Sequence, residues 1–379
     1  MRVMVLMLEP LRAVLRRPLH RHIRSLRTSA PNIRIVLVPY VSRLGTRQNG
    51  RLIAAWLKRW IGSAKVAFHC RNEAAIEWAT SLIASIGKGG IVADIRGPRP
   101  LEILFSRGYT TLADADHAAA DEYGEALARL RRALGAASAV TTVSSGMVEW
   151  LTDLGLDKKP ISYVPCCVSK PTFRSTDRDR VRRELGISQK LVMTYLGVVA
   201  PYQHLGRMVI PFIKEAMSCD DAVHFLGITP NTAALQALLR HAQLPLDRCT
   251  VMHVPHRSVA EYLSAGDAGL LVRPLDHLAK VVQPVKLGEY LAAGVPIIVS
   301  AGTSAIDTMI TASGAGLVTR FNGPNVAILR EEMGVLIPQL RSRGHSMRCA
   351  ALDFCREQFV WSQYTAVVRA AYARAIEAS

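Results

Sequence analysis

The sequence predicts an α/β protein made of two doubly wound parallel-sheet domains. Short apolar runs rich in β-branched residues alternate with helical segments, which is typical of parallel strands joined by crossover helices. The chain has 379 residues, enough for two domains of ordinary size, and the alternation begins again near residue 189. With 50% hydrophobic and 20% charged residues, the composition excludes a disordered chain.

In the first half of the chain, six buried strands are expected. They cover residues 3–8, 33–38, 66–68, 90–94, 139–143 and 161–164. Helices are expected between them, at 11–27, 52–61, from about 73 to 86, 113–134 and 147–154. The loop after the first strand, Glu9-Pro10, has none of the glycines that a dinucleotide-binding fold places there. This argues against a nicotinamide-dependent dehydrogenase.

The second half repeats the pattern. Its expected strands are 191–195, 222–226, 250–254, 268–272, 295–299 and 316–319. Its expected helices are 205–215, 259–264, 284–293, 304–311, 324–341, 348–357 and 366–378.

Polar side chains follow the expected strands of the first half. Glu9, His69, Arg71, Asp94 and Arg96 all lie at or just beyond the carboxyl ends of strands, where open α/β sheets bind ligands. Two alternatives stay open for them. His69 is equally typical of a hydrogen-bonded core histidine, and Asp94 with Arg96 of a structural ion pair.

The stretch 283–300, QPVKLGEYLAAGVPIIVS, is the most informative part of the chain. Pro284 suits the first position of a helix, and Gly294 suits its end. Lys286 and Glu289 are three residues apart and therefore share a helix face, with Gly288 between them leaving room for a ligand to approach closely. A cation near a helix N-terminus suits a diphosphate, and a carboxylate one turn later suits the paired hydroxyls of a ribose.

That stretch, read as P-x-K-L-x-E-Y-x-A-x-G-x-P-x-I, resembles the nucleotide-binding signature of retaining GT-B glycosyltransferases of family 4. HCRNEAA followed by ADIRG, YVPCCVSKPTF, and SVAEYLSAGDAGLLV are similar to other segments of the same group. The resemblance implies two Rossmann-like domains facing across a cleft. It places an acceptor-side domain at 1–168, a linker at 169–188, a nucleotide-sugar domain at 189–355, and at 356–379 a helix that crosses back to the first domain.

The resemblance further implies transfer of a sugar from a UDP- or GDP-sugar to a hydroxyl of a glycan or lipid-linked acceptor, with retention, without a cofactor or metal. This would serve cell-surface polysaccharide or glycolipid synthesis. In this interpretation Lys286 contacts phosphate, Glu289 the ribose, and a backbone amide at Gly197 the β-phosphate, with His256 near the nucleobase. His69 and Arg71 are the implied catalytic residues facing the sugar or acceptor, and Glu9, Asp94 and Arg96 line the acceptor side.

The chain departs from the family pattern in two places. The motif usually has a first glutamate where this chain has Val281, and the GVVAPYQHLG segment lacks the family's phosphate-contacting Arg and Lys. Two alternatives therefore stay open. One is a nucleotide-sugar epimerase or hydrolase of the same fold, and the other is a non-catalytic relative that binds a glycan or nucleotide.

The formal net charge is +17, and residues 1–60 carry 13 Lys or Arg against one acid. This asymmetry predicts an anionic partner for the N-terminal part. The expected helix 11–27 has either a solvated basic face or a face that contacts anionic lipid. Trp56 and Trp60, beside Lys58 and Arg59, suit a membrane interface or a core equally. A nucleic-acid partner is not expected, because the basic stretch has no recognised binding motif and few aromatic residues.

Seven cysteines without a CxxC spacing fit a reducing compartment. We see no signal peptide and no run of 18 apolar residues. The sequence therefore predicts a cytoplasmic protein, held peripherally at the inner face of the membrane if the basic helix contacts lipid.

Overall fold

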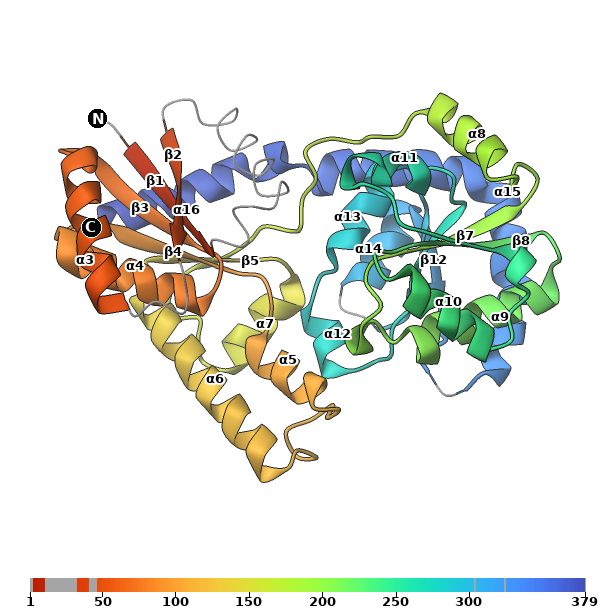
Figure 1. The fold of residues 1–379 in the computed structure, drawn as a ribbon, viewed down its shortest axis with the longest axis horizontal. Helices are drawn as coiled ribbons and strands as arrows, with labels where there is room; N and C mark the ends of the chain where they lie inside the picture. Colours follow the sequence, from red (N-terminus) through yellow and green to blue (C-terminus); the bar gives the residue numbers. More distant parts are fainter. Residues whose placement is uncertain (1–2, 11–32, 41–45, 303–304, 324, 379) are drawn as a thin grey trace. The chain divides into compact units, whose positions relative to one another are not determined.

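The computed structural model describes residues 3–10, 33–40, 46–302, 305–323 and 325–378 (Figure 1). The expected basic helix at 11–27 lies outside these residues. Contacts divide the chain into two compact units. The first unit is Met1–Pro165 with Trp361–Ser379, and the second unit is Cys166–Val360. Each contains a six-stranded parallel sheet, which confirms the predicted fold class.

The sheet of the first unit has the order β2-β1-β3-β4-β5-β6. Its strands are β1 (Val3–Pro10), β2 (Ile33–Tyr40), β3 (Lys65–Cys70), β4 (Gly90–Ile95), β5 (Ala139–Thr142) and β6 (Ile161–Tyr163). The chain runs outward from β1 to β2 and then returns to β3 on the other side. The order of the strands therefore reverses between β1 and β3, the type of position at which α/β sheets bind ligands.

The described helices of the first unit are α3 (Thr46–Ile61), α4 (Glu73–Ile86), α5 (Arg99–Ser106), α6 (His117–Ala136), α7 (Ser145–Asp153) and α16 (Thr365–Glu377). Helix α16 comes from the C-terminal end of the chain and packs on β3, β4 and β5. At Gly90 the two backbones meet so closely that an added Cβ would lie 1.9 Å from the carbonyl oxygen of Ala375. Helix α16 is thus part of the core of this unit.

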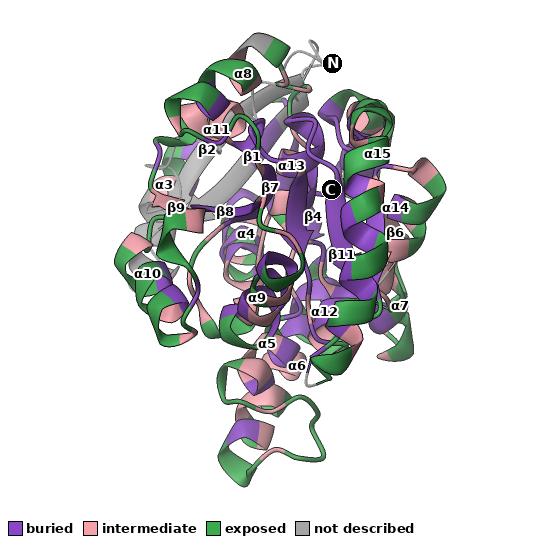
Figure 2. Ribbon diagram, turned by 90° about the vertical axis from the view of Figure 1, so that its right-hand side faces the viewer, coloured by how far each residue is buried: buried purple, intermediate pink, exposed green. Residues whose placement is uncertain are grey.

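The sheet of the second unit has the order β12-β11-β10-β7-β8-β9. Its strands are β7 (Leu191–Leu196), β8 (Val223–Ile228), β9 (Cys249–Met252), β10 (Ala268–Leu271), β11 (Ile297–Ser300) and β12 (Gly316–Thr319). Here the order reverses between β7 and β10. Strands β7, β8, β10 and β11 are buried along their whole length, as their apolar sequences predict (Figure 2).

The second unit holds the helices α8 (Ser175–Glu184), α9 (Ile210–Cys219), α10 (Thr232–His241), α11 (Val259–Leu263), α12 (His277–Val281), α13 (Val285–Ala292), α14 (Ile306–Ser313) and α15 (Ala327–Gln358). Two differences from expectation stand out. Residues 169–188 are not a separate linker, because they belong to the second unit and include α8, which packs on α11. The two helices expected at 324–341 and 348–357 form one helix, α15, with Pro338 inside it.

Within the described part of the chain, no helix has both the length and the apolar character needed to cross a bilayer.

Candidate functional site

The candidate site of the second unit lies at the reversal of strand order between β7 and β10. Gly197 directly follows β7, and Arg273 lies two residues beyond the end of β10. The carboxyl ends of neighbouring parallel strands meet at one edge of the sheet, and ligands of open α/β sheets bind there. Topology alone therefore brings these two residues to one place.

Tyr290 fixes helix α13 on this edge. Its hydroxyl accepts a hydrogen bond from the Leu196 amide at 2.7 Å and donates one to the Thr194 carbonyl at 3.1 Å, both on β7. Its ring lies against β10 at Gly269, where an added Cβ would come within 2.6 Å of a ring carbon. The tyrosine thus joins α13 to both strands that flank the reversal, and it sets the position of the residues one turn earlier on the helix.

Helix α13 brings the charged residue Lys286 to this edge. Its Nζ donates to Oε1 of Gln203 at 2.6 Å and lies 4.3 Å from the ring centre of Tyr195. An added Cβ at Gly197 would stand 3.2 Å from the same Nζ. Gly197 has φ of 137°, which favours glycine, and the lack of a side chain there leaves room for the lysine.

The surroundings of Lys286 lower its pKa to about 7. Burial is the main cause, because it disfavours the charged ammonium, and the nearby Arg273 adds repulsion. Glu289, on the same face of α13, acts in the opposite direction. The ammonium is therefore poised to become fully charged when an anion approaches.

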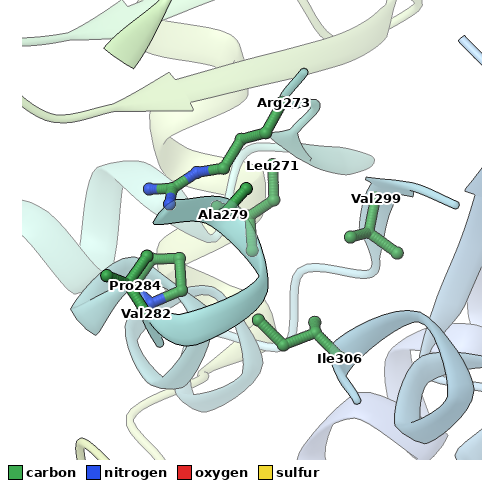
Figure 3. Close-up of a pocket in the computed structure, with 7 residues that line it drawn as sticks. All are labelled: Leu271, Arg273, Ala279, Val282, Pro284, Val299 and Ile306. Atoms are coloured by element: carbon green, nitrogen blue, oxygen red, sulfur yellow. The ribbon is translucent and has the colours of Figure 1, made fainter. Parts of the chain in front are cut away.

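Arg273 supplies a second cation close to Lys286. Its amide donates to Oγ of Ser300 at 3.0 Å, which ties the loop after β10 to the end of β11. Figure 3 shows its side chain extending past Ala279 on the side of Pro284, the residue that precedes α13. The hollow lined by these residues measures only about 10 Å³, room for about one water molecule. Burial lowers the pKa of Arg273, and Asp276 opposes that shift.

The structure corrects two details of the predicted nucleotide site. An added Cβ at Gly288 would lie 3.0 Å from the carbonyl oxygen of Cys166, so this glycine makes room for the chain itself and not for a ligand. The Gly197 amide donates to the Ile228 carbonyl at 3.0 Å and is engaged in the sheet edge, so it is not the donor expected for a phosphate.

Glu289 and His256 are the remaining residues predicted for the nucleotide. Glu289 lies half-buried on α13, one turn after Lys286, as the spacing predicted. His256 is exposed and begins the short helical turn His256–Ser258 that follows β9. Both lie toward the carboxyl edge of the sheet.

In the first unit, four of the predicted residues come together around one buried carboxylate. The Nε of Arg96 donates to Oδ2 of Asp94 at 2.7 Å, and the Nε of Arg71 lies 3.8 Å from the same oxygen. His69 is also buried, with Nε2 3.3 Å from Asp94 and Nδ1 3.2 Å from the Tyr372 hydroxyl on α16. The imidazole is thus held on both sides by neighbours within the core, as expected for a structural histidine.

The cations around Asp94 outweigh its burial. Burial alone would raise the pKa of this carboxyl, but Arg96 above all, together with His69 and Arg71, holds it well below its usual range. Thr141 donates a further hydrogen bond to Oδ1 at 3.1 Å. Asp94 therefore stays ionised and organises this edge. Glu9, the fifth predicted residue, occupies the end of β1 next to Pro39 of β2.

Sequence reasoning missed three contributors to the second-unit site: Tyr195, Gln203 and Arg273. Tyr195 and Arg273 carry a usable signal, since each lies within two residues of the carboxyl end of a strand that flanks the reversal. Gln203 has no such signal, because only the fold of the 197–204 loop brings its side chain to Lys286.

The two tryptophans of α3 do not form a core pair. Their rings stack with centroids 5.5 Å apart, and Trp56 is 58% exposed. Lys58 and Arg59 lie in the last turn of the same helix. The pair leaves apolar aromatic surface beside positive charge.

No protein-family model matches the sequence, and no curated protein matches it significantly. Solved structures do match the fold. Sucrose-phosphate synthase from Thermosynechococcus elongatus aligns over 100% of both chains, with a TM-score of 0.73 and 13% identity. Anabaena HepE in complex with UDP-glucose aligns over 99% of this chain and 100% of its own, with a TM-score of 0.66 and 11% identity. The lipopolysaccharide outer core galactosyltransferase WaaB in its apo form aligns over 97% and 98%, with a TM-score of 0.59 and 16% identity. The chain has the GT-B fold of these glycosyltransferases.

Proposed function

We propose that this protein transfers a sugar from a nucleotide-diphosphate sugar to an acceptor hydroxyl, with retention of configuration, in surface polysaccharide or glycolipid synthesis. The observation that carries the proposal is the position of Lys286. It lies beside Gly197 and near Arg273 at the β7–β10 reversal, where a GT-B fold of this topology would receive the diphosphate. HepE, which shares the fold, has been solved with UDP-glucose, so a UDP-sugar is the first donor to test.

In the proposed donor complex, Lys286 and Arg273 neutralise the diphosphate as it departs. This pair takes the place of the Arg and Lys that the 197–204 loop lacks. Lys286 comes from α13, and Arg273 comes from the loop after β10. Fixed cations of this kind stabilise charge that develops in the transition state, and removal of one typically costs about 10²–10³ in rate. Glu289 binds the ribose hydroxyls, and His256 lies on the nucleobase side.

The first unit is proposed to bind the acceptor. Arg71 and Arg96 are partly buried side chains at its carboxyl edge, and each lies within ion-pair distance of Asp94. His69 acts through Asp94 as a positioning residue, since its ring lies in the core. This revises the catalytic role first expected for His69 and leaves Arg71 as the residue that faces the substrate.

The test is a binding screen of UDP, GDP and ADP and their sugars, followed by product analysis with the nucleotide sugar that binds. Selective binding that Lys286→Ala weakens at least tenfold supports the donor site. Release of free sugar in place of an acceptor-linked product would identify a hydrolase, and an isomerised nucleotide sugar an epimerase. Binding of none of the nucleotides by a folded protein would contradict the proposal.

We further propose that the first unit attaches peripherally to anionic membrane through the Trp56–Trp60 pair and its basic neighbours. Tryptophan and Lys or Arg side chains are favoured at the lipid headgroup level. Co-sedimentation with phosphatidylglycerol vesicles tests this. Trp56→Ala with Lys58→Ala should release the protein, while Leu112→Ala with Lys158→Ala, an exposed apolar and basic pair elsewhere in the unit, should not. Equal binding by both variants would refute this surface.

A further inference from the structure

A second, strongly basic hollow lies at the opposite end of the second-unit strands from the nucleotide site. It is open to solvent, measures about 460 Å³ and borders Leu191 at the start of β7 and Asp267 just before β10. Five Arg or Lys side chains but a single carboxylate are among its lining residues, namely Arg178, Arg182, Lys190, Arg341, Arg348 and Asp267. The hollow therefore carries an excess of positive charge.

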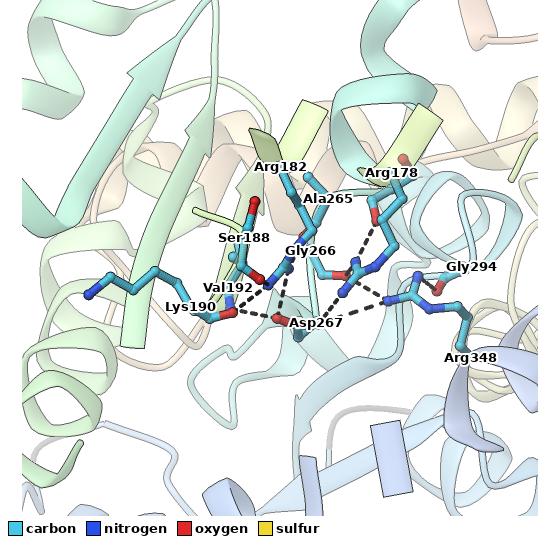
Figure 4. A network of polar contacts seen from close by, with 11 residues as sticks. Arg178, Arg182, Ser188, Lys190, Val192, Ala265, Gly266, Asp267, Gly294 and Arg348 are labelled. Atoms are coloured by element: carbon cyan, nitrogen blue, oxygen red, sulfur yellow. Dashed lines mark hydrogen bonds and ion pairs between the residues drawn. The ribbon is translucent and has the colours of Figure 1, made fainter. Parts of the chain in front are cut away.

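Three of these arginines converge on Asp267 (Figure 4). Arg178 and Arg182 come from α8, where a spacing of four residues places them on one face. Their guanidinium groups bond to the two different oxygens of Asp267. Arg348 reaches the same carboxylate from α15, with Nη2 4.0 Å from Oδ1.

The backbone holds these guanidinium groups in place. Arg178 also donates to the carbonyls of Ser264 and Gly266 at 2.7 and 2.8 Å. Arg182 donates to the Ala265 carbonyl at 2.8 Å, and Arg348 donates to the Gly266 carbonyl at 3.1 Å. Because the cations are already fixed, an anion that binds beside them causes little loss of side-chain freedom.

One carboxylate cannot balance three cations. Asp267 is itself engaged by the Val192 amide at 2.8 Å in addition to the arginines. Burial above all, together with repulsion from Arg178 and against the attraction of Asp267, lowers the pKa of Arg348 to about 10. Burial likewise lowers the pKa of Arg178. The three guanidinium groups therefore repel one another, and an added negative charge would reduce this repulsion.

The rim of the hollow adds charge at its entrance. Lys190 lies half-buried just before β7. Arg341 and His345 lie on α15 at helical spacing from Arg348, so all three line the same hollow. Arg341 forms an ion pair with Asp220, so a bound anion would share Arg341 with that carboxylate. Lys190 adds a further cation at the rim.

We propose that this basic hollow binds a small phosphate-bearing anion from solution, at a site separate from the nucleotide site. Guanidinium groups match phosphate oxygens in geometry and charge. The volume lies within the range of about 300–1,000 Å³ typical of small-molecule sites. The inference does not depend on the proposed transferase activity, because it uses only the charges and shape of this end of the second unit.

Calorimetric titration with inorganic pyrophosphate tests the proposal. Lys190→Glu with Arg341→Gln should weaken binding by about tenfold or more, because removal of one positive charge near an anion lowers the affinity by about fivefold. Lys158→Glu with Lys159→Gln is the matched control. It changes the net charge equally at exposed positions of the first unit and should leave the affinity unchanged. Lys286→Ala, which alters the nucleotide site, should also leave this binding event intact.

Three outcomes would overturn the proposal. The first is no pyrophosphate binding by the folded wild-type protein. The second is equal loss of binding in the control variant, which would indicate a general charge effect. The third is loss of binding only in Lys286→Ala, which would assign all pyrophosphate to the nucleotide site. A parallel titration with phosphatidylinositol phosphate vesicles distinguishes the source of the phosphate. Binding to vesicles without binding of free pyrophosphate is a case of the first outcome and would contradict a soluble ligand.

Discussion

At the scale of single residues, the second unit contains a partly buried lysine, Lys286, whose charge changes near neutral pH. Lys286 has a pKa of about 7 where an ordinary lysine has 10.5. Below pH 7 the ammonium is charged, and its burial lowers the free energy of unfolding. Between pH 7 and 10.5 the unfolded chain binds more protons at this lysine than the folded chain does, so this residue makes stability rise with pH there. A bound diphosphate opposes this shift and raises the pKa of Lys286, because it favours the charged ammonium.

Nucleotide-sugar binding should therefore weaken as the pH rises above 7. In the proposed donor complex the diphosphate requires a charged Lys286, so the dissociation constant should increase by up to about tenfold per pH unit between pH 7 and 9. Titrations at several pH values measure this. Lys286→Met should bind weakly with a flat profile. A wild-type affinity that is constant from pH 6.5 to 9 would show that Lys286 does not contact the diphosphate.

Glu289 should contribute to nucleotide affinity and little to stability. In the proposed donor complex, Glu289→Ala removes a charged hydrogen-bond acceptor from the ribose, which is worth about 1.5–3 kcal/mol, or about tenfold to a hundredfold in affinity. The side chain is only half-buried, so the unfolding midpoint should stay close to that of the wild type. Glu289→Gln can still form a hydrogen bond, so it should lose less nucleotide affinity than Glu289→Ala. Unchanged nucleotide affinity in Glu289→Ala would exclude the ribose assignment.

The sequence predicted the helix face that Lys286 and Glu289 share, but not the neighbours that tertiary structure brings to Lys286. Lys286 and Glu289 share a helix face whatever the rest of the chain does, so their spacing was enough. Arg273 and Gln203 reach Lys286 only through tertiary structure, from a loop that precedes α13 and from one more than eighty residues earlier. Gly288 shows the opposite error. A glycine between two binding residues suggested space for a ligand, but the Cys166 carbonyl occupies that side of the helix.

At the scale of elements, one hydroxyl group anchors α13 to the sheet. Tyr290→Phe should lower the free energy of unfolding by about 1–3 kcal/mol, because it leaves the buried Leu196 amide without this acceptor. It should also weaken nucleotide binding, since Lys286 lies on the same helix. Chemical denaturation measures the first effect. Tyr262→Phe, which removes a solvent-exposed hydrogen bond to Glu184, is the control and should cost much less. Equal costs would refute the anchoring role.

All twelve expected strands are present, with ends that differ by a few residues. The buried parallel strand β11 begins with an apolar, β-branched run, a local signal that tertiary structure reinforces. Helix α15 was harder to predict. The sequence predicted two helices, 324–341 and 348–357, with a break between them that contains Gly344. The helix continues because its apolar side packs on α9 and α13, and this packing outweighs the local preferences.

At the scale of the whole molecule, each unit has its own charge centre, the buried Asp94 in the first and the partly buried Asp267 in the second. Asp94→Asn should destabilise the first unit by about 3–5 kcal/mol, because it leaves the partly buried Arg96 uncompensated. Hydrogen exchange should accelerate at amides of β3 to β5 and α16 but remain unchanged at β7 and β10. Asp153→Asn, at an exposed position, is the control. Faster exchange in both units would contradict independent cores.

The same substitution should alter the acid limb of the stability curve. A carboxyl whose folded pKa is depressed stabilises the protein at pH values above its ordinary value of 3.8. That contribution is lost as the pH falls from 3.8 through the lower folded value. The wild-type protein should therefore lose stability more steeply below pH 4 than Asp94→Asn does. The free energy of unfolding of both proteins should be measured against pH. Equal slopes below pH 4 would contradict this contribution of Asp94.

Helix α16 has a consequence for how the chain acquires its structure during synthesis. The second unit is continuous in sequence, but the first is completed only by residues that follow Val360. On the ribosome, β3, β4 and β5 emerge early and must wait, with the apolar surface that α16 covers still open, until the whole second unit has been translated. We therefore expect the later-made unit to mature first. In a series of stalled nascent chains, protease resistance should appear in residues 166–360 before it appears in residues 46–165.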